Sequence, residues 1–259
     1  MTGTYRGRED EAKEKRAAKA SAAAEALKRG EVVLLYDFDD RERETDLVIG
    51  AGFVTPEHIW QLRRDAGGLV CVAIDPVACS NLGLPYIADV LKFAAGSAKG
   101  DENGNGRGND AEGGEDFGAI ESLCERQGDI PYDTKSSFSL WVNHRETFTG
   151  ITDFDRALTI KRLAEVTRQA MNGGSVNFGA EFRSPGRART SRREEGADGA
   201  VHRPRQGREG RPAVVVCEML DGETGRALSK EEAMRYAELR SLAFVEGEDV
   251  LGLFEEMRD

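Results

Sequence analysis

The fold is decided by residues 32–46, which read VVLLYDFDDRERETD. The first five residues form a continuous apolar run with two β-branched side chains after Gly30, which is typical of a strand buried on both faces. Six carboxylates follow within residues 37–46, with two arginines between them. Because ligands of open α/β sheets bind in the crevice beyond the strand ends, this pattern indicates acidic side chains that converge on a ligand.

The acidic run has two interpretations. If the segment stays extended, Glu42 and Glu44 share one face and Arg41 and Arg43 share the other, because side chains alternate along a strand. Such carboxylates hold a hard cation, and a guanidinium binds a phosphate or a hydroxyl group. The alternative is a solvated turn on an acidic protein, since charge runs usually face the solvent.

Residues 40–46, which read DRERETD, resemble the signature loop of the 3,4-dihydroxy-2-butanone 4-phosphate synthase family of riboflavin biosynthesis. The resemblance continues in the family's order through GGLVC at 67–71, TGIT at 149–152, Asp155-Arg156, FRSPG at 182–186 and Cys217-Glu218. The spacings are similar to those of archaeal members, and the motifs together cover most of residues 25–255. Each motif alone is weak evidence, but the ordered set is specific.

This resemblance implies the fold and the reaction. We expect a single α+β domain over residues 1–259, with a central mixed β-sheet flanked by helices. The family implies a monofunctional lyase that uses Mg²⁺ or Mn²⁺ to convert D-ribulose 5-phosphate to 3,4-dihydroxy-2-butanone 4-phosphate and formate. It also implies a homodimer with active sites at the subunit interface.

The resemblance also assigns roles to particular residues. The catalytic candidates are Glu218, Glu44 and Cys71. Glu218 is the acid/base group, Glu44 assists proton transfer or the metal, and Cys71 lies near the substrate or is a plain buried thiol. The substrate-binding candidates are Arg41, Glu42, Asp46, Thr149 and Glu218, and the metal ligand is Glu42.

The composition excludes several classes of protein. A formal net charge of -11 argues against nucleic acid or an anionic membrane as a partner. No apolar run is long enough to cross a bilayer, and the charged N-terminus lacks the apolar core of a signal peptide, so we expect a cytoplasmic protein. The four cysteines form no Cys-x-x-Cys pair, which argues against a zinc site or a disulfide framework. The excess of acid also fits a high-salt cytoplasm.

Local patterns predict the elements around these motifs. Residues 8–29 favour a helix that ends at Gly30. Further helices are expected from Thr55-Pro56, from Asp75-Pro76, over 159–171, from Ser229 and over 248–257, and strands at 47–49, 69–74, 137–142, 213–216 and 242–245. The polar groups of 149–152 indicate either a phosphate contact or ordinary capping by Thr152 or Asp153.

Two segments differ from the rest of the chain. Residues 96–118 contain almost no apolar side chains, so we expect a disordered acidic insertion. Residues 187–211 contain eight arginines and are typical of a basic tail, yet they separate two motifs of one fold. The family has Gly-His-Thr-Glu-Leu at the position of residues 196–200, so Ala197 stands where the second Mg²⁺ ligand is expected.

We interpret residues 187–211 as the product of a reading-frame error. With suitable codons for Ala197–Gln206, reading one base later gives Gln-Thr-Glu-Leu-Ser-Thr-Ala-Leu-Ala, which restores Thr-Glu-Leu in register. One alternative is a genuine basic loop over the substrate, in which His202 and Arg203 replace the absent ligand. Others are a catalytically inactive, dimer-forming paralogue and a different metal-dependent sugar-phosphate lyase or isomerase.

Overall fold

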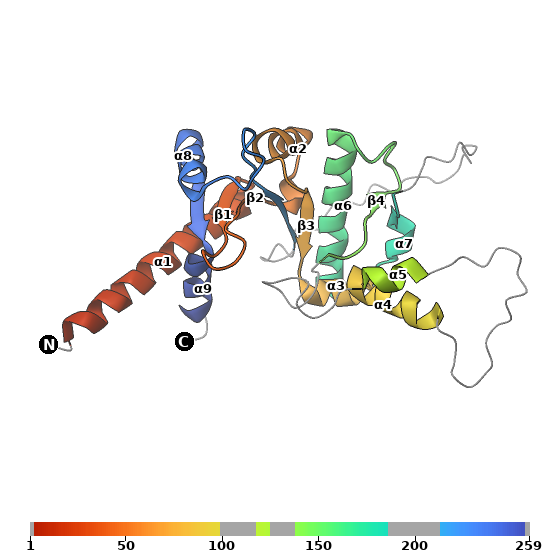
Figure 1. Cartoon of the computed structure of the whole chain (residues 1–259), viewed down its shortest axis with the longest axis horizontal. Helices are drawn as coiled ribbons and strands as arrows, with labels where there is room; N and C mark the ends of the chain where they lie inside the picture. Colours follow the sequence, from red (N-terminus) through yellow and green to blue (C-terminus); the bar gives the residue numbers. More distant parts are fainter. Residues whose placement is uncertain (1–2, 99–117, 125–137, 186–212, 257–259) are drawn as a thin grey trace, which may run out of the picture. The chain divides into compact units, whose positions relative to one another are not determined.

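The computed structural model describes residues 3–98, 118–124, 138–185 and 213–256 (Figure 1). It contains two compact units, one of residues 1–78 with 142–259 and one of residues 79–141. The basic segment predicted at 187–211 lies outside the described residues, as do positions 99–117 of the predicted insertion.

The prediction that residues 96–118 form a disordered insertion is wrong at both ends of this range. Residues 96–98 are helical, because helix α4 (Ile87–Ala98) continues through them, and helix α5 (Gly118–Leu123) begins at Gly118. These helices belong to the smaller unit, where the Ile87 amide donates to the Phe138 carbonyl at 2.9 Å.

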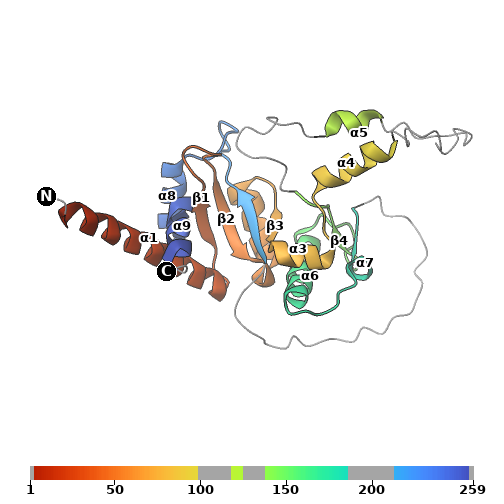
Figure 2. The same ribbon diagram turned by 90° about the horizontal axis from the view of Figure 1, so that it is seen from below.

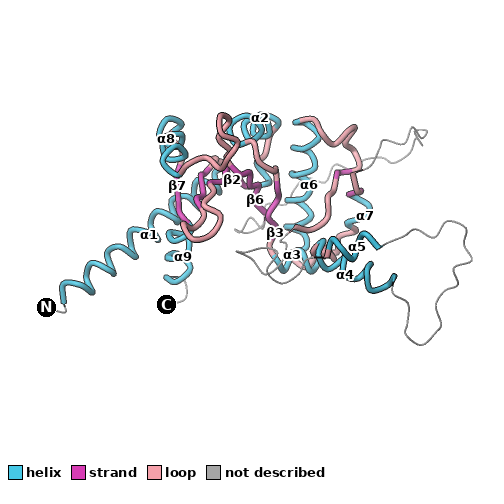
Figure 3. The backbone as a smooth tube through the Cα atoms, in the orientation of Figure 1, coloured by secondary structure: helices cyan, strands magenta, loops and turns pink. Residues whose placement is uncertain are grey.

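A five-stranded sheet forms the centre of the larger unit, in the order β3-β6-β2-β1-β7. Its strands are β1 (Val33–Tyr36), β2 (Thr45–Gly50), β3 (Cys71–Ile74), β6 (Ala213–Glu218) and β7 (Ala243–Glu246). β1 and β7 pair in parallel and the other pairs are antiparallel, so the predicted mixed sheet is confirmed. The acidic run joins β1 to β2 as a hairpin loop (Figure 3), whereas the sequence indicated the open end of an α/β sheet.

One face of this sheet carries the main core. The fully buried side chains on it include Leu34, Leu47, Ile49, Val215 and Cys217. They pack against residues of α2 (Pro56–Gln61), η2 (Leu62–Ala66), α6 (Asp153–Met171) and α8 (Lys230–Arg240). Alternation of side chains therefore assigns the neighbouring residues of each strand to the opposite face.

On the opposite face, helices cover β1 and β7, and Val48 of β2 is buried there as well. There α1 (Gly3–Arg29) packs Ala23 and Ala26 against Val33 and Val245, and α9 (Gly247–Glu256) contacts α1 and β7. Figure 2 shows α1, α8 and α9 toward the β1 side of the sheet and α6 toward its β3 side. Over β6 and β3 the described side chains on this face are partly or largely exposed.

The helix boundaries follow from their caps. Gly30 has φ +84° directly after α1, which starts at Gly3, earlier than the predicted residue 8. Thr55 caps α2 and Ser229 caps α8 by accepting backbone N–H groups, as predicted. The helix predicted over 159–171 begins at Asp153. Among the described helices, none combines the length and hydropathy that a membrane span requires.

The strand predicted at 137–142 is wrong. Within the described residues 138–142 there is no strand, and Phe138, Leu140 and Trp141 are exposed, so their alternation has no buried face to match. Of the strand predicted at 69–74, the structure confirms Cys71–Ile74, which form the edge strand β3. Leu69 and Val70 precede the strand. The remaining elements of the larger unit are η1 (Ala51–Phe53), α7 (Phe178–Glu181) and a two-stranded ribbon of β4 (Asn143–His144) and β5 (Phe182–Arg183). Helix α3 (Pro76–Leu82) follows β3, as predicted.

Candidate active site

The loop between β1 and β2 is shaped by Asp37. Its Oδ2 accepts the backbone N–H of Glu42 at 3.0 Å, and its Oδ1 accepts from Arg41 Nη1 at 3.2 Å. Residues 39–42 form turns and Arg43 has φ +58°, so the segment is not extended. The condition for Glu42 and Glu44 to share one face, an extended segment, is therefore not met.

Strand pairing brings three of the candidate residues to one face of the sheet. Asp46 on β2 lies directly opposite Glu218 on β6, and Cys71 on β3 lies opposite Val216. Because residues i and i+2 point to the same side of a strand, Asp46, Glu218 and Cys71 share the face that helices leave partly open.

Glu218 is held by the turn that precedes β3. Its Oε2 accepts the Leu69 backbone N–H at 2.7 Å, and its carbonyl oxygen accepts the Gly68 N–H at 3.0 Å. A Cβ atom on Gly68 would lie 2.3 Å from Glu218 Oε2, well inside contact distance. Only glycine at position 68 therefore allows this carboxylate to occupy its position.

We call Asp37, Glu42, Glu44, Asp46 and Glu218 the acidic edge. Burial raises the pKa of Asp46 to about 7, and the charges of Glu218, Glu44, Glu42 and Asp37 contribute in that order. Burial also raises the pKa of Glu44, with Glu42 and Glu218 next in effect. Glu42, in the loop between β1 and β2, and Glu218, on β6, thus act on the same two carboxyl groups.

One carboxylate oxygen at this edge lacks a partner. Within the described residues, Asp46 Oδ1 is buried and makes no hydrogen bond, and the same holds for Thr45 Oγ1 on the core side of β2. A buried acceptor without a donor is costly, and such groups occur where a ligand or ion completes the site. Asp46 Oδ1 is therefore a candidate contact for a bound ligand or ion at the acidic edge.

Cys71 lies beside this cluster as a neutral thiol. Burial, followed by the charges of Glu218 and Asp46, raises its pKa to about 11. The thiol therefore stays protonated at neutral pH and is a poor nucleophile. Cys217, on the core face, is fully buried.

Thr149 lies in a different cluster. Its backbone N–H and its Oγ1 donate to Asp155 Oδ2 at 2.9 and 3.2 Å, and its Oγ1 also accepts the Ile151 N–H. In the described part of the chain, no hydrogen bond joins it to the acidic edge. Thr152 caps α6 by accepting the Asp155 N–H at 3.1 Å, which confirms the capping interpretation of this segment.

Several residues of the site were not predicted. Asp37 lies in the acidic run but was given no role, although it fixes the position of Glu42. The Gly67-Gly68 pair was treated as a motif only, although a close approach of another backbone is a common reason for glycine. The contact of the Leu69 amide with Glu218 spans 149 residues of sequence, so no local pattern could indicate it.

A family model described as 3,4-dihydroxy-2-butanone 4-phosphate synthase matches residues 21–252. The chain belongs to the 3,4-dihydroxy-2-butanone 4-phosphate synthase family. It is 44% identical over 248 residues to the 3,4-dihydroxy-2-butanone 4-phosphate synthase of Archaeoglobus fulgidus, covering 90% of this chain and 93% of that one. It is 42% identical over 237 residues to that of Methanosarcina acetivorans, covering 88% of each chain.

A solved structure supports the fold. The crystal structure of a 3,4-dihydroxy-2-butanone 4-phosphate synthase in complex with two magnesium ions matches with a TM-score of 0.55 and 22% identity, covering 92% of this chain and 97% of that one. The predicted family, the α+β fold class with its mixed central sheet, and the assignment as a synthase of this kind are confirmed.

The donor chemistry of the acidic edge fits a hard cation. Carboxylate oxygens are the ligands that Mg²⁺ prefers, and the unpartnered Asp46 Oδ1 with its surrounding negative charge favours a positive ion. Among the described residues, however, no group of three or more His, Cys, Asp or Glu side chains is arranged to hold a metal. The described residues thus supply suitable ligands but not a complete set.

Proposed function

We propose that this chain converts D-ribulose 5-phosphate to 3,4-dihydroxy-2-butanone 4-phosphate and formate at the acidic edge. Family membership supports the reaction, and the convergence of Glu42 and Glu218 on Asp46 supports the location. The reaction needs proton abstraction beside a carbonyl, loss of a hydroxyl, a shift of the carbon skeleton and release of one carbon. Carboxylates in unequal protonation states suit such proton transfers.

Glu218 and Asp46 have different roles, acid/base catalysis and substrate binding. The Leu69 amide fixes the Glu218 carboxylate at the end of β6, where it serves as the acid/base group. Asp46 lies opposite with a pKa of about 7, so at neutral pH it holds a proton for part of the time and hydrogen-bonds the sugar phosphate in either state. Glu44, whose pKa is also raised, assists proton transfer.

Glu42 and Arg41 bind the polar groups of the substrate. Arg41, placed by Asp37, provides the guanidinium for a phosphate or hydroxyl group, and Glu42 is the candidate metal ligand. A divalent cation, Mg²⁺ or Mn²⁺, would stabilise negative charge on the sugar oxygens when bound there. Because Ala197 stands where the family has its second ligand, we expect weak metal binding and little turnover from this chain.

Two further expectations accompany the function. A homodimer would complete each active site, and a cytoplasmic location suits an enzyme that acts on a phosphorylated sugar. Sedimentation equilibrium of the full-length chain measures the first, with a mass of two chains as the expected result. A mass of one chain at working concentration contradicts it.

The test measures formate release from ribulose 5-phosphate with Mg²⁺. Two proteins are compared, the chain with its present sequence and a hybrid that carries the corresponding interval of the Archaeoglobus fulgidus relative in place of residues 187–211. The proposal expects little formate from the first and clear Mg²⁺-dependent formate release from the second. Full activity of the unmodified chain contradicts the interpretation that residues 187–211 are damaged. A hybrid that folds but is inactive favours the interpretation as a catalytically inactive paralogue.

A further inference from the structure

The loop Phe148–Gly150 is built around a carboxylate of its own. Asp155 Oδ1 accepts the Phe148 N–H at 3.2 Å, and Oδ2 accepts the N–H groups of Thr149 and Gly150 at 2.9 and 2.8 Å. The Thr149 hydroxyl donates to the same Oδ2 at 3.2 Å. A single side chain therefore receives three consecutive amides and the hydroxyl group that was predicted to meet the substrate.

Hydrogen bonds rather than packing hold this loop. Phe148 is 85% exposed and Ile151 is 67% exposed, so the apolar side chains at its two ends bury little surface. Consecutive amides close to a helix start form a site for an anion, and here Asp155 supplies the anion. Partial burial acts to raise the pKa of Asp155, but the Gly150, Thr149 and Phe148 amides outweigh it and lower the pKa below its ordinary value.

The other side of the loop rests on β4. The Thr147 amide and hydroxyl donate to the His144 carbonyl at 3.1 and 2.7 Å. Gly150 has φ +78°, and a Cβ on it would lie 2.0 Å from Asn143 Nδ2, so the loop backbone lies directly against β4. The loop is thus fixed between a strand and a helix.

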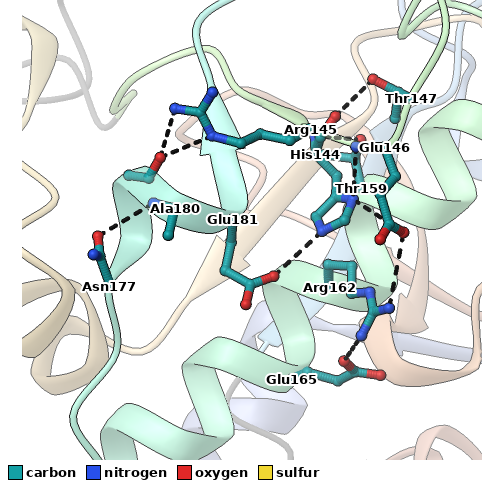
Figure 4. Close-up of polar contacts among 11 residues, drawn as sticks. His144, Arg145, Glu146, Thr147, Thr159, Arg162, Glu165, Asn177, Ala180 and Glu181 are labelled. Atoms are coloured by element: carbon teal, nitrogen blue, oxygen red, sulfur yellow. Dashed lines mark hydrogen bonds and ion pairs between the residues drawn. The ribbon is translucent and has the colours of Figure 1, made fainter. Parts of the chain in front are cut away.

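The strand that supports the loop is itself well anchored. Figure 4 shows the buried His144 ring facing Glu181 of α7, with Nε2 and Oε2 3.3 Å apart. Its Nδ1 accepts the Glu146 N–H at 3.3 Å, and its backbone N–H donates to Thr159 of α6 at 3.1 Å. β4, α6 and α7 are therefore joined by directed hydrogen bonds around one imidazole.

An ion pair connects this region to the acidic edge. Arg63 of η2 donates from Nε and Nη2 to the two carboxylate oxygens of Asp153, both at 2.8 Å. Asp153 begins α6, two residues before Asp155. Helix η2 ends at Ala66, and its C-cap Gly67 directly precedes the Gly68-Leu69 turn that binds Glu218. The turn under Glu218 and the helix that carries Asp155 are thus joined by a bidentate contact.

We propose that Asp155 is a positioning residue, whose carboxylate fixes the Phe148–Gly150 loop so that Thr149 is presented to the substrate in a preformed arrangement. This role rests on the proposed function, because it assumes that Thr149 contacts the sugar phosphate. Binding is tighter when a loop is ordered before the ligand arrives, since the ligand does not bear the ordering cost.

The experiment uses the full-length chain and three variants. Asp155→Ala removes every acceptor, and Asp155→Asn keeps one carbonyl oxygen. Glu165→Gln is the matched control, since Glu165 lies on the same helix and forms an ion pair with Arg162 on that helix. Amide exchange at residues 148–150 is followed by NMR. The dissociation constant for ribulose 5-phosphate is measured by calorimetry without added metal, so that no turnover interferes.

The expected order is the same in both measurements. Exchange at the three amides accelerates by about tenfold or more in Asp155→Ala, less in Asp155→Asn, and not in the control. The dissociation constant rises by about fivefold or more in the same order. Rescue by the asparagine distinguishes positioning from a general loss of stability.

Two outcomes overturn the proposal separately from the function. Unchanged exchange in Asp155→Ala shows that the carboxylate does not order the loop. Faster exchange with an unchanged dissociation constant shows an ordered loop that the substrate does not use. Absence of ribulose 5-phosphate binding by the unmodified chain instead counts against the proposed function, and the positioning role is overturned with it.

Discussion

The acidic edge and the Phe148–Gly150 loop surround their carboxylates in opposite ways. Asp46 lies beside Glu218 on the neighbouring strand, has one oxygen without a partner among the described residues, and has its pKa raised to about 7. Asp155 receives three amides and a hydroxyl, and its pKa is lowered. The first arrangement leaves charge for a ligand to neutralise, and the second uses charge to hold the backbone.

This difference separates chemistry from support. A carboxylate whose hydrogen-bonding capacity is satisfied within the protein is a poor acid or base, because its protonated form is disfavoured. A carboxylate crowded by like charges exchanges its proton near neutral pH. We therefore assign proton transfer to the acidic edge and positioning to the loop, and the following predictions test that division.

The largest expected effect is that of Glu218→Gln on catalysis. Loss of the acid/base group lowers formate release from the hybrid by about 100- to 10,000-fold, the usual contribution of such a group. The glutamine amide oxygen can still accept the Leu69 N–H, so the thermal unfolding midpoint should change little. Glu223→Gln, in the exposed turn after β6, is the control. Formate release within a few-fold of the parent would remove Glu218 from the mechanism.

Gly68→Ala should follow in size. The added Cβ would lie 2.3 Å from Glu218 Oε2 and must displace this carboxylate, so kcat in the hybrid should fall by about 100-fold. Gly52→Ala is the matched control, because a Cβ there meets no atom within 4 Å and no positive φ opposes it. Equal activities of the two variants would mean that the turn does not position Glu218.

Asp46→Asn should change stability in a pH-dependent way. The folded-state pKa of about 7 exceeds the unfolded value of about 3.9, so the native state binds the extra proton between them. The contribution of Asp46 to the free energy of unfolding is therefore fully present below about pH 4, and it is lost as the pH rises through about 7. Urea unfolding should show the variant more stable than the parent by roughly 1–4 kcal/mol at about pH 8 and equal to it at about pH 4. A stability difference that is independent of pH would contradict the crowding of charge at this edge.

The smallest expected effect concerns the ion pair between Arg63 and Asp153. The pair is partly exposed, so a double-mutant cycle with Arg63→Ala and Asp153→Ala should give a coupling energy of about 0.2–1 kcal/mol that decreases with added salt. The pair would then orient η2 and α6 without holding the fold together. A coupling energy above about 3 kcal/mol would show instead a desolvated pair that the fold needs.

Local signals in the sequence predicted most of the fold. Apolar runs located β1, β2 and β6, and the caps at Thr55 and Ser229 located two helix starts. The alternation at 137–142 failed because its apolar side chains are exposed, so the period reflects no buried face. The acidic run was read as the end of an open sheet, but its strands pair as a hairpin, which one strand alone cannot reveal.

The site was predicted in its residue types and less well in its arrangement. Motif order brought Glu42, Asp46, Cys71 and Glu218 into one hypothesis, and their mutual electrostatic effects agree with it. Thr149 was predicted to bind the same substrate. The structure shows that Thr149 hydrogen-bonds Asp155, because the loop folds back on its own helix. This loop conformation depends on the positive φ of Gly150 and on the N-cap conformation of Thr152. The periodicity of apolar residues in the sequence does not predict either of them.

The most direct test of the central claim is a carboxyl NMR titration of the full-length chain without metal, in which Asp46 and Asp155 are followed in one sample. We predict a pKa of about 7 for Asp46 and a pKa for Asp155 below the ordinary value of about 3.9. Similar pKa values near 4 for both groups would contradict the division between a crowded, reactive edge and a satisfied, supporting loop.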